Sequence, residues 1–126
     1  MKLDVSVLAL SARLQKFVEF ANAVARRERL TSWTLVLWGG PCEAECDDGR
    51  KTIYMGTCPT LGQMKQLFLH EVAHALMRPK GRKDPIWQES FWHGPRWGRN
   101  FDRLMKKHLP GVKPNPAIAE LPRRSK

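Results

Sequence analysis

The sequence of 126 residues predicts a single α+β domain with an N-terminal helix, a three-stranded antiparallel sheet, a central helix and a C-terminal helix. Two segments, residues 11–28 and 60–77, repeat apolar residues at helical spacing. Between them, short β-branched and aromatic runs alternate with turn signals rich in Gly, Pro and Asp. A chain of this length buries one hydrophobic core and is too short for two domains.

The first helix is expected over residues 11–28. One face is apolar, formed by Leu14, Phe17, Val18, Ala21, Val24 and Ala25. Its start is open, because Leu3, Val5 and Val7 alternate as in a strand, while a helix that begins near Asp4 is the alternative.

The sheet is expected between residues 33 and 57. Residues 33–38 are β-branched and aromatic, and Gly39-Gly40-Pro41 ends that strand. Residues 42–46 alternate apolar and acidic side chains, as a half-buried strand does. Asp48-Gly49 is a hairpin turn signal, so residues 51–57 form the return strand and complete an antiparallel meander.

The chain has three cysteines, Cys42, Cys46 and Cys58. On one strand, Cys42 and Cys46 would lie about 13 Å apart at about 3.3 Å per residue, too far to share a metal ion. If that segment is a loop, the three thiols could approach one another instead. We expect buried free thiols. An odd number of cysteines also favours a reducing compartment over a disulfide framework.

The run His70-Glu71-Val72-Ala73-His74 is the most informative motif in the chain. It lies in the helix expected over 60–77, which begins at a capping box on Thr60. One helical turn separates His70 from His74, so both imidazoles can ligate one zinc ion. The Glu71 carboxylate can then reach the water that the ion activates. A core helix with incidental histidines is the alternative, but buried His and Glu side chains need partners.

A catalytic zinc usually takes three protein ligands and keeps one position for water. The candidates after His74 are Glu89, His93, Asp102 and His108. His93 follows a loop rich in Pro, Gly and charge, and stands just before Pro95, which is suited to the first position of a helix. These residues alone leave the four candidates open, and Glu89 is the main alternative to His93, since glutamate is the third ligand in other zincins.

The C-terminal helix is expected to begin at Pro95. Its apolar stripe consists of Trp97, Phe101, Leu104, Met105 and His108. Its basic stripe consists of Arg96, Arg99, Arg103 and Lys106. Residues 110–126 contain further prolines and end in a basic cluster, so we expect them to form an extended tail after a domain spanning residues 1–109.

The order H-E-x-x-H, a variable loop and H-G-P-x-aromatic resembles the SprT-like zinc metallopeptidases, which include the eukaryotic Spartan proteases and the related WLM group. The matching residues are His70, Glu71, His74, His93, Gly94, Pro95 and Trp97. The resemblance covers roughly residues 11–109 and implies a zincin-like fold. It also implies one zinc ion per chain on His70, His74 and His93, Glu71 as the catalytic base, and a proteolytic role linked to DNA.

The chain departs from that family in two places. Many bacterial members carry a C-terminal cysteine-rich zinc ribbon, and no cysteine follows Cys58 here. The aromatic position, often Phe in the family, is Trp97. The missing ribbon weakens the inference about DNA more than the inference about peptidase activity.

We therefore expect a zinc-dependent endopeptidase acting on DNA-associated proteins. The net charge of +10 favours an anionic partner, and Arg96, Arg99, Arg103 and Lys106 are the expected DNA contacts. The alternative is a nucleic-acid-binding module with a structural or vestigial zinc site, but such a site has no need for Glu71.

Two parts of the expected active site stay open. Tyr54, Arg96 and His108 are the candidates for stabilising the oxyanion, and the sequence does not rank them. The strand at residues 51–57 is expected to align a substrate backbone by strand addition.

No stretch approaches the roughly 20 apolar residues that cross a membrane. Residues 5–10 are too short for the core of a signal peptide. We therefore expect a cytoplasmic protein without a membrane partner, associated with the nucleoid if it binds DNA.

Overall fold

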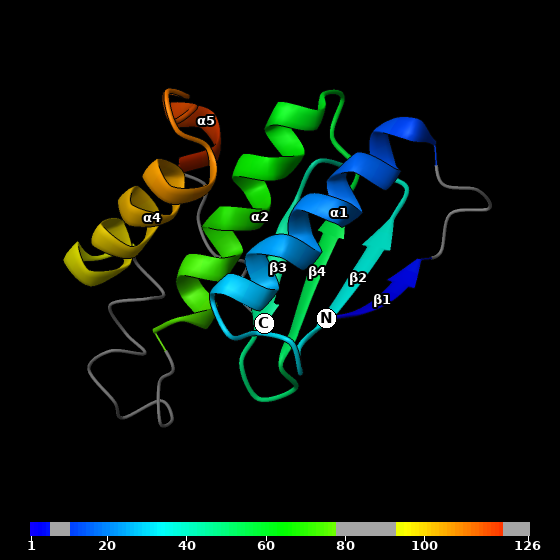
Figure 1. Ribbon diagram of the computed structural model, residues 1–126, viewed down its shortest axis with the longest axis horizontal. Helices are drawn as coiled ribbons and strands as arrows, with labels where there is room; N and C mark the ends of the chain where they lie inside the picture. Colours follow the sequence, from blue (N-terminus) through cyan, green and yellow to red (C-terminus); the bar gives the residue numbers. More distant parts are fainter. Residues whose placement is uncertain (6–10, 78–92, 120–126) are drawn as a thin grey trace.

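The computed structural model describes residues 1–5, 11–77 and 93–119. Its elements in chain order are β1 (Lys2–Val5), α1 (Ala12–Arg27), β2 (Thr34–Trp38), β3 (Ala44–Asp47), β4 (Thr52–Gly56), α2 (Leu61–Ala75), α4 (Pro95–His108) and α5 (Pro116–Ala119). The predicted α+β class is confirmed. Helix α2 lies between α1 and α4, and α1 and α2 cover one face of the sheet (Figure 1).

The sheet is four-stranded and mixed, in the order β1-β2-β4-β3, so the predicted three-stranded antiparallel meander is wrong. Strands β1 and β2 are parallel, β2 and β4 are parallel, and only β3 and β4 are antiparallel. The reason is burial. Ile53 and Met55 in β4 are fully buried and flanked by buried Thr52 and Gly56, which suits a central strand. In β3, only alternate residues are buried, which suits an edge.

Helix α1 begins at its N-cap Ser11, whose Oγ accepts a hydrogen bond from the Leu14 backbone at 3.2 Å. This agrees with the expected helix over 11–28. Residues Lys2–Val5 pair with β2 as a strand, so the alternative helix start near Asp4 is wrong. The buried face of α1 packs on α2, where the rings of Phe17 and Phe68 meet edge to face at 5.8 Å.

The connection between β2 and β3 is held against the end of β4. A Cβ on Gly56 would lie 1.7 Å from the Pro41 carbonyl oxygen, so this close approach requires glycine. Cys42 and Cys58 form a disulfide, whereas the buried Cys46 keeps its thiol, which donates to Asp48 Oδ1 at 3.6 Å. The expectation of free thiols is therefore wrong for Cys42 and Cys58. Cys42 lies before β3 rather than within it, which brings its Cα to 4.5 Å from that of Cys58.

Helix α2 begins with the predicted capping box. The Gln63 backbone donates to Thr60 Oγ1 and the Thr60 backbone donates to Gln63 Oε1, both at 3.1 Å. From Gln66 to Ala75 every residue is buried, because α1, α4, α5 and the sheet all contact this helix. Within the described ranges, no helix is long and apolar enough to cross a membrane.

The chain after α4 returns to α2. Pro116–Ala119 forms α5, which packs against α2, and Ile118 is 4% exposed. The segment expected to be an extended tail therefore contains a short helix, α5, that packs against the fold. Residues 120–126 lie outside the described residues.

Candidate metal centre

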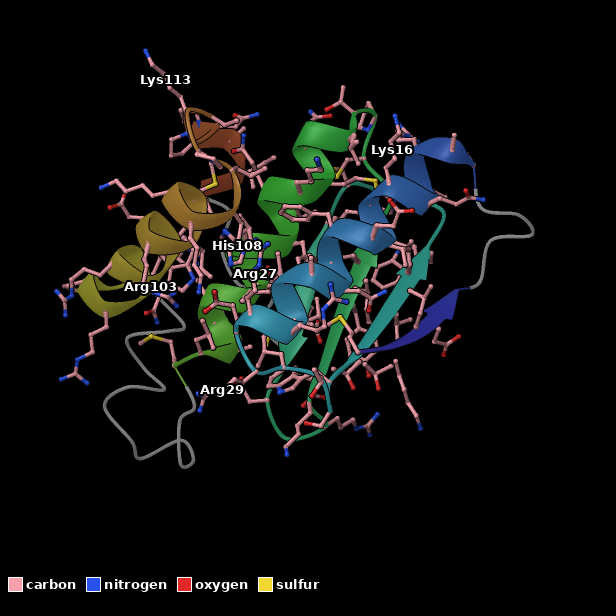
Figure 2. All side chains as sticks on the ribbon, in the orientation of Figure 1. Lys16, Arg27, Arg29, Arg103, His108 and Lys113 are labelled. Atoms are coloured by element: carbon pink, nitrogen blue, oxygen red, sulfur yellow. A yellow bond between two sulfur atoms is a disulfide. The ribbon has the colours of Figure 1, made fainter. Side chains whose placement is uncertain are left out.

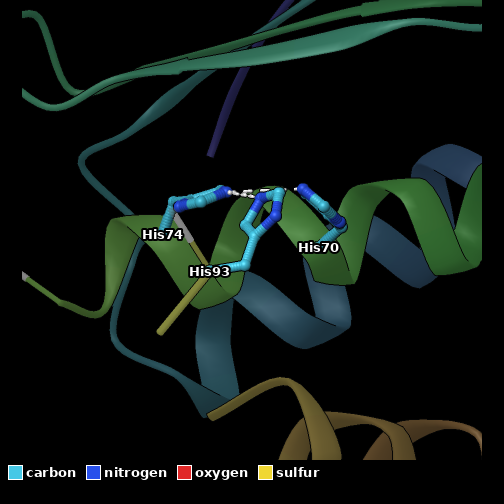
Figure 3. A group of neighbouring side chains, drawn as sticks. All are labelled: His70, His74 and His93. Carbon is cyan, nitrogen blue, oxygen red and sulfur yellow. Dashed lines mark hydrogen bonds between the residues drawn. The ribbon is translucent and has the colours of Figure 1, made fainter. Parts of the chain in front are cut away.

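Three histidines converge on one point. Helix α2 places His70 and His74 one turn apart, and His93 enters from the residue before the N-cap of α4. The Nε2 atoms of His70 and His74 are 3.3 Å apart, and those of His74 and His93 are 3.1 Å apart. One ligand atom from each of the three residues lies within 4.8 Å of the other two. Figure 3 shows the three rings turned toward one another.

Two of the three nitrogen separations match the ligand spacing of a tetrahedral ion. Metal–imidazole bonds of about 2.05 Å at tetrahedral angles place two ligand nitrogens about 3.3 Å apart. The separations of 3.3 Å between His70 and His74 and 3.1 Å between His74 and His93 are close to that edge length. A proton shared between two rings satisfies one pair of nitrogens, whereas a bound cation satisfies all three lone pairs at once. The three histidines can therefore hold a metal ion.

The surroundings of the His70 ring favour its neutral form. Its side chain is 1% exposed. Burial is the largest cause that lowers the pKa of His70, the positive charge of His93 adds to it, and a backbone interaction with Ile118 opposes it, so that the pKa falls from 6.5 to about 3. At neutral pH the ring is uncharged, and a neutral imidazole is the form that ligates a metal.

His93 is held in an uncommon backbone conformation. Its φ is +56°, the left-handed region, which costs a residue with a Cβ on the order of 1 kcal/mol. The predicted helix start at Pro95 is confirmed, with Gly94 as its N-cap. Because the surroundings must enforce this conformation, the junction itself aims the His93 ring at α2.

The other predicted ligand candidates do not join this cluster. Asp102 pairs with Lys106 on the surface of α4 at 2.9 Å, and His108 pairs with Glu28 at 2.8 Å. Glu89 lies outside the described residues. Of the four candidates after His74, the structure therefore brings His93 to the other two histidines.

Glu71 lies beside the cluster. Its side chain is 3% exposed, and its Oε2 atom is 3.7 Å from His70 Nε2. A carboxylate at this distance is outside bonding range of that nitrogen but close to the point where the rings converge. It is placed to accept a proton from a water molecule held there.

Trp97 is part of the site in a way that the sequence did not indicate. Its ring centroid is 4.8, 5.5 and 4.4 Å from those of His70, His74 and His93. Its Nε1 donates to the His70 carbonyl oxygen at 3.3 Å. The sequence indicates only an apolar helix face and an aromatic family position for Trp97. The available signal was its place in the first turn of the helix that begins directly after His93 and Gly94.

The predicted basic stripe is on the exposed side of α4, but part of its charge is paired. Arg103 contacts Glu28 at 3.0 Å, and Lys106 contacts Asp102 at 2.9 Å. Arg99 is exposed and lines a shallow hollow on this helix together with Asp102, Arg103, Lys106 and Lys107. Arg96 is exposed on the first turn of α4. The face is therefore less positive than its four cations suggest.

Two of the three candidates for oxyanion stabilisation lie elsewhere. His108 is committed to Glu28. Tyr54 alternates with the core residues Ile53 and Met55 along β4, so its side chain is on the opposite face of the sheet from the helices. Arg96, in the first turn of α4 and next to Trp97, is the candidate that the fold leaves near the cluster.

Comparison of the chain with protein-family models, with curated proteins and with solved structures gives no match.

Proposed function

We propose that the protein is a zinc-dependent endopeptidase of the SprT-like type. The observation that carries the proposal is the convergence of the His70, His74 and His93 ring nitrogens within 4.8 Å of one another, beside the buried Glu71 carboxylate. Structural zinc sites usually have four protein ligands, and the cluster found among the described residues has three. Three imidazoles with one open position suit a catalytic zinc ion.

The residues of the site divide the chemistry between them. When bound, zinc lowers the pKa of water and polarises the scissile carbonyl. Glu71 takes the proton of the attacking water and then delivers it to the leaving amine. Burial of its carboxylate, with 3% of the side chain exposed, limits competition from bulk water. The Trp97 ring, from α4, contacts all three histidine rings and covers that side of the cluster.

The substrate backbone is proposed to pair with β3. The sequence favoured residues 51–57 for this role, but β4 hydrogen-bonds to β2 on one side and to β3 on the other. That expectation is wrong because the backbone N–H and C=O groups of a central strand are already paired with the two neighbouring strands. Strand β3 is at the edge of the described sheet and packs against α2, which carries Glu71. An extended peptide can add to such an edge through main-chain hydrogen bonds.

Action on DNA-associated proteins is the finer part of the proposal. It is supported by the net charge of +10 and by the exposed cations of α4. Two of these cations, Arg96 and Arg99, are in the first turns of α4, at the end of the helix that is next to His93. The alternative, a nucleic-acid-binding module with a structural or vestigial zinc site, draws on the same charge. Glu71 distinguishes the two, because a module without hydrolysis has no use for its carboxylate.

The test is hydrolysis of an unfolded protein substrate by the zinc-loaded chain. Wild type should cleave it, and E71Q should keep zinc and fold yet lose nearly all activity, since an amide cannot accept the proton. E19Q, at an exposed glutamate on α1, is the matched control and should still cleave. Equal cleavage by wild type and E71Q would overturn the mechanism. A zinc-loaded wild type that cleaves nothing, with or without single-stranded DNA, would overturn the enzyme assignment.

A further inference from the structure

The segment after α4 is attached to the metal helix by one buried side chain. Gln66 is 7% exposed, and its Oε1 accepts a hydrogen bond from the Asn115 backbone at 2.7 Å. Its Nε2 donates to the Lys113 carbonyl at 3.4 Å. A buried amide bonded on both ends to backbone is a specific anchor, because a buried polar group left without a partner destabilises the fold.

This anchor is one helical turn from the first metal-ligand candidate. Gln66 and His70 are four residues apart on α2, so they share a face of that helix. The segment attached to Gln66 continues into α5, where the Ile118 backbone N–H donates to the Asn115 carbonyl at 2.9 Å. Ile118 is buried and α5 packs on α2. The α5 backbone is thereby brought to the His70 side of the site.

His70 has one ring nitrogen that the cluster does not use. Nε2 faces His74, whereas Nδ1 is buried and has no hydrogen-bond partner among the described residues. The Ile118 backbone is next to this ring, on the buried segment that packs against α2, and its carbonyl is placed to be the acceptor that Nδ1 lacks. Metal-ligating histidines usually donate their second ring N–H to such a carbonyl or carboxylate, which fixes the tautomer and the ring orientation.

We propose that residues 113–119 form a support for the metal centre, in which the Ile118 carbonyl accepts the Nδ1–H hydrogen of His70. This bond directs the Nε2 lone pair of His70 toward the ion. Gln66 is the positioning residue that seats the support, and it touches neither metal nor substrate. The proposal rests on the zinc site proposed above and extends it to a part of the chain that carries no ligand.

The first experiment measures zinc affinity by chelator competition in two variants of full-length protein. Q66M removes both anchoring bonds at similar volume and should weaken zinc binding about 10- to 100-fold. Q66E keeps the acceptor for the Asn115 N–H and should restore most of the affinity. N22A, on α1 and outside the contacts of Gln66 given above, is the control and should match wild type. Unchanged affinity in a folded Q66M protein would overturn the role of Gln66.

The second experiment needs no variant. Long-range ¹H–¹⁵N NMR of the zinc-loaded wild type should show His70 with a hydrogen on Nδ1 that exchanges slowly with solvent, and with Nε2 as the metal-bound nitrogen. A ring that binds metal through Nδ1, or that exchanges its Nδ1 hydrogen as fast as an exposed histidine, would overturn the proposal. A chain that binds zinc with this tautomer but cleaves nothing would refute the peptidase assignment alone, whereas a chain that binds no zinc would refute both.

Discussion

The imidazole Nε2 of His108 lies 2.8 Å from Glu28 Oε2, which joins the last turn of α4 to the end of α1. Lys107 and Arg103 contact the same carboxylate at 2.9 and 3.0 Å, and the Glu28 side chain is 5% exposed. Arg103 and His108 extend from α4 toward α1 (Figure 2). One buried carboxylate therefore fixes α4, and with it the start of that helix at the metal centre, to the rest of the fold.

The first prediction concerns this carboxylate. Burial raises the pKa of Glu28, but hydrogen bonds from His108, Lys107 and Arg103 outweigh it and lower the pKa from 4.5 to about 2. The stabilisation from Glu28 is therefore complete above pH 4.5 and is lost as the pH falls toward 2. At pH 7, E28Q should reduce the free energy of unfolding by about 3 kcal/mol in urea titrations, because it removes the buried carboxylate that Arg103, Lys107 and His108 contact.

The control for E28Q is D102N, which breaks the exposed pair with Lys106. Exposed pairs contribute little, so D102N should change the free energy of unfolding by less than about 1 kcal/mol. Equal losses from the two variants, or a loss from E28Q that persists unchanged at pH 2, would contradict the account of the Glu28 cluster.

The second prediction concerns pH and the metal-free protein. The pKa of His70 is about 3 in the folded state against an ordinary 6.5, so the unfolded chain binds more protons between these values. The stability of the folded state that depends on a neutral His70 ring is complete above pH 6.5 and is lost as the pH falls toward 3. Denaturant unfolding in a chelator should give a free energy about 2 kcal/mol lower at pH 5 than at pH 7.5. H70Q should reduce this difference in unfolding free energy between pH 5 and pH 7.5. The same difference in H70Q and wild type would contradict the role given to His70.

The third prediction concerns Trp97. W97F keeps an aromatic ring beside the histidines but loses the N–H donated to the His70 carbonyl, and should weaken zinc affinity several-fold. W97A also opens a cavity and should lower the free energy of unfolding by about 3–5 kcal/mol. W33F, at a buried tryptophan before β2, is the matched control. Zinc affinities that fall equally in W33F and W97F would show that Trp97 has no special role.

The fourth prediction concerns DNA. If the α4 face binds phosphates, R99E should weaken binding to labelled oligonucleotides and reduce the salt slope by about 1 to 2 units, with zinc content unchanged. Arg103 is a poorer test position, since its reversal also disrupts the Glu28 cluster. R50E in the exposed β3–β4 turn is the matched control. No anisotropy change for wild type at micromolar protein and low salt would remove DNA from the proposal.

The sequence predicted those features whose determinants are local. The capping box of Thr60 and Gln63, the helix start at Pro95 and the one-turn spacing of His70 and His74 each depend on residues within a few positions. His93 was identified from its place at a junction, and its φ of +56° shows that the junction aims the ring.

The features that were missed depend on contacts distant in sequence. The Cys42–Cys58 disulfide closes a separation of 16 residues, and the Gln66–Asn115 bond spans 49. The position of β4 between β2 and β3 follows from burial on both of its faces, which a run of five residues does not reveal on its own. Trp97 was placed on the correct helix face, but its contact with all three histidines depends on how α4 packs against α2.

The most direct test of the central claim is X-ray absorption at the zinc edge of protein loaded with one equivalent of metal. We expect one tetrahedral zinc per chain with three imidazole nitrogens and one light solvent ligand, all at about 2.0–2.1 Å. H93A should lose an imidazole from that shell, while E71Q should keep all three. Sulfur scattering at about 2.3 Å, or an imidazole count that H93A leaves unchanged, would contradict a catalytic centre built from His70, His74 and His93.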